Sequence, residues 1–410
     1  MKLKLQNIGI IQDAEINIDG ITLIAGQNDT GKSTVGKILY AIVKGFNQSE
    51  SQFQEEKNRM ISYYYQDILK ELKKNWKADI TEFQIKETNN SWVDTIEELI
   101  SNDTLPDEFK KPILDKLNGL KNYLNKQYNT IDSKEEEIEK WINSEISILQ
   151  NVFNSEYKNS KIEIEDLLGN AVIEHRFKTI VKYIYVSLDN NLETYYKNAY
   201  FIESPLIIDE SLQRFVGSDG LSYSRNRQEE LAKSLSNSIQ RDLADYSEIY
   251  SEISKIINGE ITIDLLEGVR YKKNDREINI KNTAVGIKSF GLIQLLLKNN
   301  RLNNRTLLII DEPEVHLHPT WQVKYAEILV RLSKEFEIPM VLTSHSPYFI
   351  EALESYSKKY KYESSTNFYF AEKNEGGSSS KITDVNNNLS QIYSSISEAS
   401  YKLRNILKHE

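Results

Sequence analysis

Hydrophobic and polar residues alternate at the amino end of the chain, a pattern that predicts β-strands at residues 2–8, 13–18 and 21–25. Asp19-Gly20 is typical of a hairpin turn, and we expect it to join the last two strands. A helical spacing of apolar residues follows from Val35 to Val43. Gly45 predicts the end of that helix.

The middle of the chain has a different pattern. Residues 46–196 are polar and rich in Lys, Glu, Asn and Tyr, with amphipathic helical spacing at 107–126 and 133–153. We therefore predict a helical insertion over 46–196, stabilised by its own apolar stripes. Residues 1–45 and 197–410 would form one domain around it.

Strand patterns return after the insertion. They occur at 199–202, 307–310, 339–342 and 367–371, and the run at 307–310 is continuously apolar, as expected of a parallel strand buried on both faces. Between them we predict a helical subregion at 209–257 and a hairpin that pairs 261–267 with 277–281. The Gly- and Ser-rich segment 376–380 predicts a loop, and 389–407 a final helix. The fold class is therefore α/β.

Composition narrows the class of protein. Of 410 residues, 39% are hydrophobic and 27% charged, which is typical of a soluble globular chain. No apolar run reaches the roughly 18 residues that a membrane span needs. The absence of cysteine excludes disulfides, thiolate zinc sites and a cysteine nucleophile. With no signal-peptide pattern at the amino end, we expect a cytoplasmic protein without membrane contact.

A glycine-rich segment after the third strand carries the first candidate chemistry. It reads G-x-x-x-x-G-K-S, the phosphate-binding loop of P-loop nucleotidases, with a strand before it and a helix after it. The two glycines let backbone N–H groups face a polyphosphate, and the following helix adds its positive end. Lys32 would reach the β- and γ-phosphates of ATP, and Ser33 would ligate Mg²⁺. The predicted nucleotide-binding residues here are Gly26, Asn28, Asp29, Thr30, Gly31, Lys32, Ser33 and Thr34.

Two carboxylates at the end of the strand 307–310 form the second candidate centre. Ligands of open α/β sheets bind at the carboxyl ends of the strands. We predict that Asp311 holds the Mg²⁺ that bridges the phosphates. Glu312 would orient or deprotonate the attacking water.

The segments D-E-P-E-V-H-L-H-P at 311–319 and T-S-H-S-P at 343–347 resemble the Walker B segment and the H-loop of ABC-type ATPases. More narrowly, they are similar to the overcoming-lysogenization-defect (OLD) family and to ATPase subunits of antiphage systems such as Septu and PARIS. The resemblance implies an ABC-type ATPase head, nucleotide held between two heads, and His345 as a γ-phosphate contact. The alternative for His345 is a capping residue at the strand end. The resemblance makes His316 and His318 structural and dimer-facing rather than metal ligands.

A degenerate version of the ABC signature lies at 286–294, with Ser289 22 residues before Asp311. The resemblance implies that Ser289 and Gly291 contact the γ-phosphate held by a second subunit, with Lys288 adding charge. The alternative is an ordinary helix start that Ser289 caps. The strand end expected to carry a Q-loop shows Glu203-Ser204-Pro205 and no glutamine.

These features predict an ATPase that forms dimers or higher oligomers around ATP and Mg²⁺. We expect it to control a separately encoded effector, a nuclease of HNH or TOPRIM type, in antiphage defence, because the last 60 or so residues lack the acidic clusters of the OLD nuclease domain. The alternatives are an SMC-like repair clamp, which the absence of sustained heptads disfavours, a transporter-coupled ATPase, and a scaffold locked by nucleotide without turnover.

Nucleic acid contact is a weaker prediction, since the net charge is −10. The basic positions that could serve it are more typical of a solvated surface. They are Lys298, Arg301, Arg305, Arg225, Arg227, and Lys358, Lys359 and Lys361 interleaved with Tyr356, Tyr360 and Tyr362.

Overall fold

The computed structural model describes residues 1–75, 107–126, 137–138, 140–142, 161–165, 174–177, 184–187, 196–209, 227–236, 247–264, 268–274 and 276–395. The chain divides into two compact units. The head unit comprises Met1–Asn47 with Glu135–Glu410, and the helical unit comprises Gln48–Lys134. None of the described helices has both the length and the hydropathy that crossing a membrane requires.

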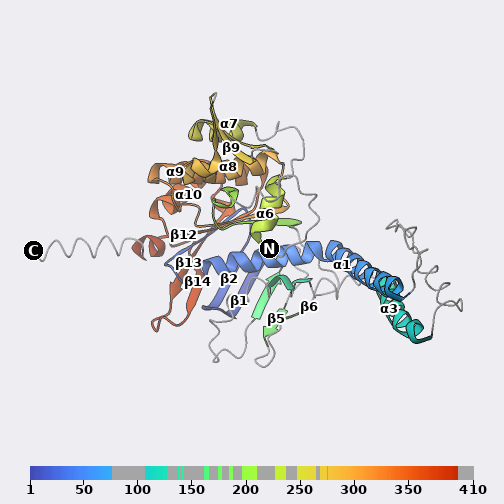
Figure 1. The fold of residues 1–410 in the computed structure, drawn as a ribbon. Helices are drawn as coiled ribbons and strands as arrows, with labels where there is room; N and C mark the ends of the chain where they lie inside the picture. Colours follow the sequence, from blue (N-terminus) through green and yellow to red (C-terminus); the bar gives the residue numbers. More distant parts are fainter. Residues whose placement is uncertain are drawn as a thin grey trace, which may run out of the picture. The chain divides into compact units, whose positions relative to one another are not determined.

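One mixed sheet runs through the head unit, in the strand order β6-β5-β4-β1-β2-β14-β13-β3-β12-β11-β7 (Figure 1). Neighbouring strands from β13 to β7 pair in parallel. The strands are β1 (Lys2–Ile8), β2 (Ile11–Asn17), β3 (Ile21–Gly26), β4 (Lys161–Glu165), β5 (Glu174–Phe177), β6 (Ile184–Ser187), β7 (Asn198–Ile202), β11 (Thr306–Asp311), β12 (Met340–Ser344), β13 (Thr366–Lys373) and β14 (Ser380–Asp384). A second sheet, in the order β10-β9-β8, consists of β8 (Glu260–Asp264), β9 (Gly268–Lys273) and β10 (Arg276–Asn279).

Helices cover both faces of the parallel strands. Successive side chains of a strand point to opposite faces of the sheet, so each strand contributes to two hydrophobic cores. Leu23 and Leu342 belong to the core that α8, α9 and α10 complete, whereas Ile24 and Val341 belong to the core that α1 completes (Figure 1). Each such buried aliphatic side chain contributes about 1.5–3 kcal/mol. The helices are α1 (Lys32–Asn75), α3 (Asp107–Asn125), α6 (Arg227–Ser236), α7 (Ser247–Ile257), α8 (Val285–Lys298), α9 (Pro319–Phe336) and α10 (Pro347–Lys359), with 3-10 turns at Ile280–Asn282 and Glu363–Ser365.

In the helical unit, α3 packs its apolar stripe inward. Ile113, Leu117 and Leu120 recur at helical spacing and are buried. Gly119 allows a close approach, because a Cβ there would lie 2.7 Å from the Tyr64 ring. Lys116 Nζ pairs with Asp67 Oδ2 at 2.8 Å. The unit is shorter than the predicted insertion 46–196.

Part of the predicted helical insertion is wrong, because β4, β5 and β6 lie within it and extend the sheet from β1. The sequence of β4 alternates strictly, and Ile162 and Ile164 are buried opposite Leu5 and Leu3. Of the predicted helix 133–153, residues 137–138 and 140–142 are helical and the rest lie outside the described residues.

The predicted helix stop at Gly45 is also wrong, since α1 continues to Asn75. A Cβ at Gly45 would lie 2.6 Å from the Ile138 Cα, so this glycine permits close packing between segments rather than ending the helix. The predicted hairpin at Asp19-Gly20 does not form either. β3 pairs with β12 and β13, while β2 pairs with β1 and β14.

Two further local predictions need correction. Residues 261–267 do not pair with 277–281, because β9 lies between β8 and β10 and forms a hairpin with each. The predicted loop 376–380 ends in β14, a strand absent from our sequence-based prediction. Of the predicted helical stretch 209–257, α6 and α7 are described, and of the final helix 389–407, residues 390–395 are helical.

Candidate functional site

The phosphate loop connects β3 to α1 at the carboxyl edge of the parallel strands. Both of its glycines are required by the backbone. Gly26 has φ +151°, and a Cβ there would lie 2.2 Å from the Ala371 carbonyl oxygen. Gly31 has φ +86°, and a Cβ would lie 2.5 Å from the Ile11 side chain. The loop is therefore shaped by β2 and β13 as well as by its own sequence.

Lys32 opens α1 and turns its side chain back across the loop. Its Nζ donates a hydrogen bond to the Gln27 carbonyl at 2.6 Å, and the side chain is only 5% exposed. Burial lowers the pKa of Lys32, and the nearby carboxylates of Glu312 and Asp311 oppose that shift. A cation thus stands inside the loop with two carboxylates close enough to affect it.

Asp311 reaches the loop from the other end of the chain. Ser33 Oγ donates to Asp311 Oδ1 at 2.9 Å, and Thr343 Oγ1 donates to the same oxygen. The register explains the meeting, because Asp311 lies beside Thr343 on β12, which in turn lies beside β3. The hydroxyl of Ser33 and the carboxylate of Asp311 are hard oxygen ligands of the kind Mg²⁺ prefers, and they converge on one point. The pair fits the predicted magnesium role.

Glu312 stands in a left-handed conformation, with φ +48°. Its N–H donates to the Thr343 carbonyl at 3.2 Å and lies 3.1 Å from Thr343 Oγ1. Its Oε1 lies 3.3 Å from Nδ1 of His345, and both side chains reach solvent. The structure therefore brings Glu312 and His345 together beside Asp311.

Glu314 was missed by the sequence analysis as a member of this site. Its buried Oε1 accepts hydrogen bonds from Ser344 Oγ at 2.7 Å and from the backbone N–H of His345 at 3.0 Å. The second glutamate of D-E-P-E was the available signal, and its spacing from the strand end did not reveal where it points.

A family comparison fits this geometry. The profile of the AAA ATPase domain family matches residues 1–350, which is most of the chain. The chain belongs to the AAA ATPase domain family. The α/β P-loop ATPase fold predicted from the sequence is confirmed. The OLD-like branch stays a prediction.

The chain is similar to other known proteins as well. A protein of Vibrio cholerae serotype O1 biovar El Tor, named as a probable ATPase of retron Vc95, is 25% identical over 252 residues, 59% of this chain. The match spans 40% of that protein's length. Among solved structures, the SMC head domain of Thermotoga maritima aligns at 10% identity and a TM-score of 0.41, covering 94% of this chain and 98% of that one. An SMC head bound to the C-terminal winged-helix domain of ScpA aligns at 11% identity and a TM-score of 0.45, covering 93% of this chain and 96% of that one.

The signature-like segment 286–294 begins at the second residue of α8, and Ser289 lies beyond the first turn of the helix. The helix begins at Val285 with Ala284 as N-cap, so the alternative in which Ser289 caps it is wrong. Ser289 is 6% exposed, and its Oγ donates to the Val285 carbonyl at 3.3 Å. A Cβ on Gly291 would lie 2.3 Å from Ile261, so that glycine serves packing against β8. Their contact with a second subunit stays a prediction.

Ser289 does share a narrow crevice with Asp311 and Glu312 of its own chain. Ser204 and Pro205, at the predicted Q-loop position, line the same crevice. Lys288 is not available to a ligand in this arrangement. It is buried, and its Nζ contacts Asp209 Oδ2 at 2.7 Å.

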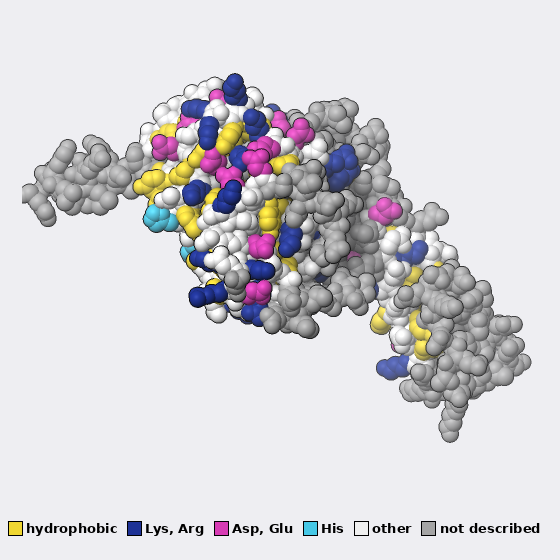
Figure 2. Space-filling model, turned by 90° about the horizontal axis from the view of Figure 1, so that it is seen from above, with side chains coloured by type: hydrophobic (Ala, Val, Ile, Leu, Met, Phe, Trp, Pro, Cys, Tyr) yellow, Lys and Arg dark blue, Asp and Glu magenta, His cyan; other side chains and the backbone are white. Residues whose placement is uncertain are grey.

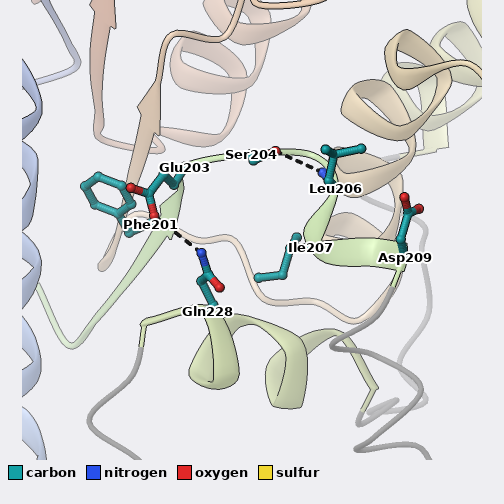
Figure 3. Close-up of a pocket in the computed structure, with 7 residues that line it drawn as sticks. All are labelled: Phe201, Glu203, Ser204, Leu206, Ile207, Asp209 and Gln228. Carbon is teal, nitrogen blue, oxygen red and sulfur yellow. Dashed lines mark hydrogen bonds between the residues drawn. The ribbon is translucent and has the colours of Figure 1, made fainter.

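A pocket of about 330 Å³ opens next to the end of β7 (Figure 3). In it, Glu203 accepts hydrogen bonds from the side chains of Gln228, at 3.4 Å, and Arg227, at 3.0 Å. The end of β7 therefore carries a carboxylate that is paired with Arg227 and Gln228. The lining residues are Phe201, Glu203, Ser204, Leu206, Ile207, Asp209 and Gln228.

The structural and dimer-facing role that the resemblance implied for His316 and His318 stays a prediction. His318 is the N-cap of α9, and its Nδ1 accepts from the Thr320 N–H at 3.3 Å. His316 has φ +66° in the same turn. In the part of the chain that the structure describes, no group of three or more His, Cys, Asp or Glu side chains could hold a metal ion.

The basic positions considered for nucleic acid are largely engaged within the protein. Lys358 pairs with Glu354, and Lys359 pairs with Glu327 at 2.9 Å and lies over the stacked rings of Tyr356 and Tyr360. On the face shown in Figure 2, Lys and Arg side chains are interspersed with Asp and Glu. Arg225 lies outside the described residues. These contacts favour the solvated-surface interpretation.

Proposed function

We propose that this protein binds ATP with Mg²⁺ at the phosphate loop and hydrolyses it. The observation that carries the proposal is the 2.9 Å hydrogen bond from Ser33 Oγ to Asp311 Oδ1. It joins the start of α1 to a strand end 278 residues away, so a loop built for phosphates and a carboxylate suited to magnesium meet at one place. Membership of an ATPase family and the relative named as an ATPase support the same activity.

The roles follow from position. Lys32 would neutralise charge on the β- and γ-phosphates from inside the loop, and Ser33 with Asp311 would hold Mg²⁺. Mg²⁺ held by these two residues would offset the negative charge of the phosphates. Glu312 would orient the attacking water and take its proton, and His345 beside it would contact the γ-phosphate. Preorganised charges of this kind supply most of the catalysis in phosphoryl transfer.

The first experiment separates binding from chemistry. Lys32→Ala should lose ATP affinity, because the phosphates lose the buried cation. Glu312→Gln should keep affinity and lower turnover about 10²–10⁴-fold, the range for removal of a general base. Fluorescent-nucleotide titration and phosphate release measure the two quantities.

Glu351→Gln, an exposed carboxylate on α10, is the matched control and should behave as wild type. Unchanged turnover in both Lys32→Ala and Glu312→Gln would show that this site does not hydrolyse ATP.

The proposal includes assembly around nucleotide. We propose that ATP joins two or more heads, with Ser289 and Gly291 of one head facing the nucleotide of another. A shift from mostly separate to mostly assembled heads takes about 5.5 kcal/mol of differential binding. Glu312→Gln with ATP should therefore show a larger mass by light scattering than the same variant without it. An unchanged mass would remove this part of the proposal.

We further propose that this protein controls a separately encoded effector in cytoplasmic antiphage defence. The effector would be a nuclease of HNH or TOPRIM type. The relative that is named as a probable ATPase of retron Vc95 supports this proposal. Co-expression with the neighbouring reading frame should yield a complex and protect cells in a plaque assay. Protection that survives Glu312→Gln would instead favour a scaffold that holds nucleotide without turnover.

A further inference from the structure

Glu314 links two turns that each follow a parallel strand. It lies after β11 and is only 4% exposed. Its Oε1 accepts from Ser344 Oγ at 2.7 Å, from the N–H of His345 at 3.0 Å and from the N–H of Ser346 at 3.2 Å. One carboxylate oxygen therefore organises the start of the turn between β12 and α10.

That turn has other support that does not depend on Glu314. Gln322 on α9 donates to the Leu317 carbonyl at 3.0 Å and accepts from Ser346 Oγ at 2.6 Å. Ser346 is the N-cap of α10, and its Oγ accepts from the Phe349 N–H at 3.4 Å. The first turn of α10 is thus capped without a carboxylate.

Burying a carboxylate at this place is unfavourable in itself. Burial raises the pKa of Glu314, although donors from His345 and Ser344 oppose the shift. Its second oxygen, Oε2, is buried and receives no hydrogen bond from any described residue. A charged side chain that costs free energy in a turn already capped by its neighbours points to a role outside folding.

We propose that Glu314 is a positioning residue for the ATPase reaction, which holds the turn after β12 so that the His345 imidazole stays beside Glu312. Nδ1 of His345 lies 3.3 Å from Glu312 Oε1 and 3.6 Å from Glu314 Oε1. With Nδ1 held between two carboxylates, Nε2 is the ring nitrogen left for a phosphate oxygen. This inference rests on the proposed function.

The test compares Glu314→Ala, Glu314→Gln, His345→Ala and the double variant Glu314→Ala with His345→Ala. Glu314→Ala should lower kcat about 10–100-fold, the range for removing a group that orients a catalytic ligand, and change KM less than about threefold. Glu314→Gln should recover about tenfold of that loss, because an amide oxygen accepts the same N–H groups.

The double variant decides between positioning and general damage. If Glu314 acts through His345, kcat of the double variant equals that of His345→Ala within about twofold. Multiplied losses, or equal losses in Glu314→Gln and Glu314→Ala, would overturn the inference. Hydrogen exchange should show faster exchange at the N–H groups of His345 and Ser346 in Glu314→Ala, and unchanged protection would overturn it too.

The controls separate the two proposals. Glu351→Gln should match wild type in kcat, KM and melting temperature. If wild type and this control hydrolyse no ATP, the proposed function fails and the Glu314 inference falls with it. If both are active and the losses at Glu314 and His345 multiply, only the inference fails. Should Glu314→Ala not fold, the Glu314→Gln and His345→Ala pair, with its own double variant, gives the same comparison.

Discussion

Ser380 holds the phosphate loop from a strand that the sequence did not predict. Its side chain is fully buried at the start of β14, and its Oγ donates to the Thr30 carbonyl at 2.8 Å. The same oxygen lies 3.3 Å from the Ile10 carbonyl. Replacing Ser380 by alanine removes the hydrogen bond that its hydroxyl donates to the Thr30 carbonyl.

The expected cost follows from those contacts. A neutral hydrogen bond contributes about 0.5–1.5 kcal/mol net, and a buried acceptor left unpaired costs about 1–3 kcal/mol. We expect Ser380→Ala to lower the free energy of unfolding by about 1–3 kcal/mol, which lowers the melting temperature of a 410-residue chain by about 1–4 °C. Because Thr30 belongs to the loop, the dissociation constant for ATP should also rise several-fold.

Calorimetry and nucleotide titration check both quantities. Ser378→Ala is the matched control, because Ser378 is exposed in the same connection between β13 and β14. If Ser380→Ala and Ser378→Ala have the same melting temperature and the same affinity for ATP, β14 does not support the loop, and the reasoning is refuted.

Two further predictions concern packing and charge. Gly45→Ala would place a Cβ 2.6 Å from the Ile138 Cα, so thermal unfolding should show a loss of about 1–3 kcal/mol. In the control Gly376→Ala, the added Cβ would lie 3.9 Å from its nearest neighbour, Ser378 Oγ, so the free energy of unfolding should change little. Burial alone would raise the pKa of Glu327, but hydrogen bonds from Tyr360 and Lys359 lower this pKa by more. The ionised Glu327 side chain therefore stabilises the folded protein at a pH above the pKa that this group has in the unfolded chain. That stabilisation is lost as the pH falls through the lower pKa of the folded protein. Glu327→Gln should lower the melting temperature slightly at pH 7, a difference of about 0.2–1 kcal/mol, and match wild type in strong acid.

The sequence predicted the site best where function dictates the residues themselves. Gly26 and Gly31 must adopt positive φ, and the continuous apolar run before Asp311 reports a strand buried on both faces. Those signals are local, so they can be found without knowledge of pairing. The meeting of Ser33 with Asp311 followed because parallel strands end at one edge of a sheet.

The failed predictions concern pairing between distant segments. Asp19-Gly20 carries a good hairpin signal, yet β3 lies between β12 and β13, whose burial on both sides outweighs one turn. Gly45 has the composition of a helix stop, but the reason for it is the backbone of a segment nearly a hundred residues later. β4 carries a clear alternation that the polar composition around it hid.

The residues of the site that the sequence analysis missed share a property. Thr343, Glu314 and Ser380 each bond to backbone groups or to other side chains of the site, and the contacts they make come from neighbouring strands. A backbone N–H or carbonyl has no identity in the sequence, so no motif records which side chain binds it. Sequence motifs therefore identify the residues that are suited to contact a nucleotide. The groups that hold those in place are found only when the register of β3, β12 and β11 is known, because that register decides which strand ends meet.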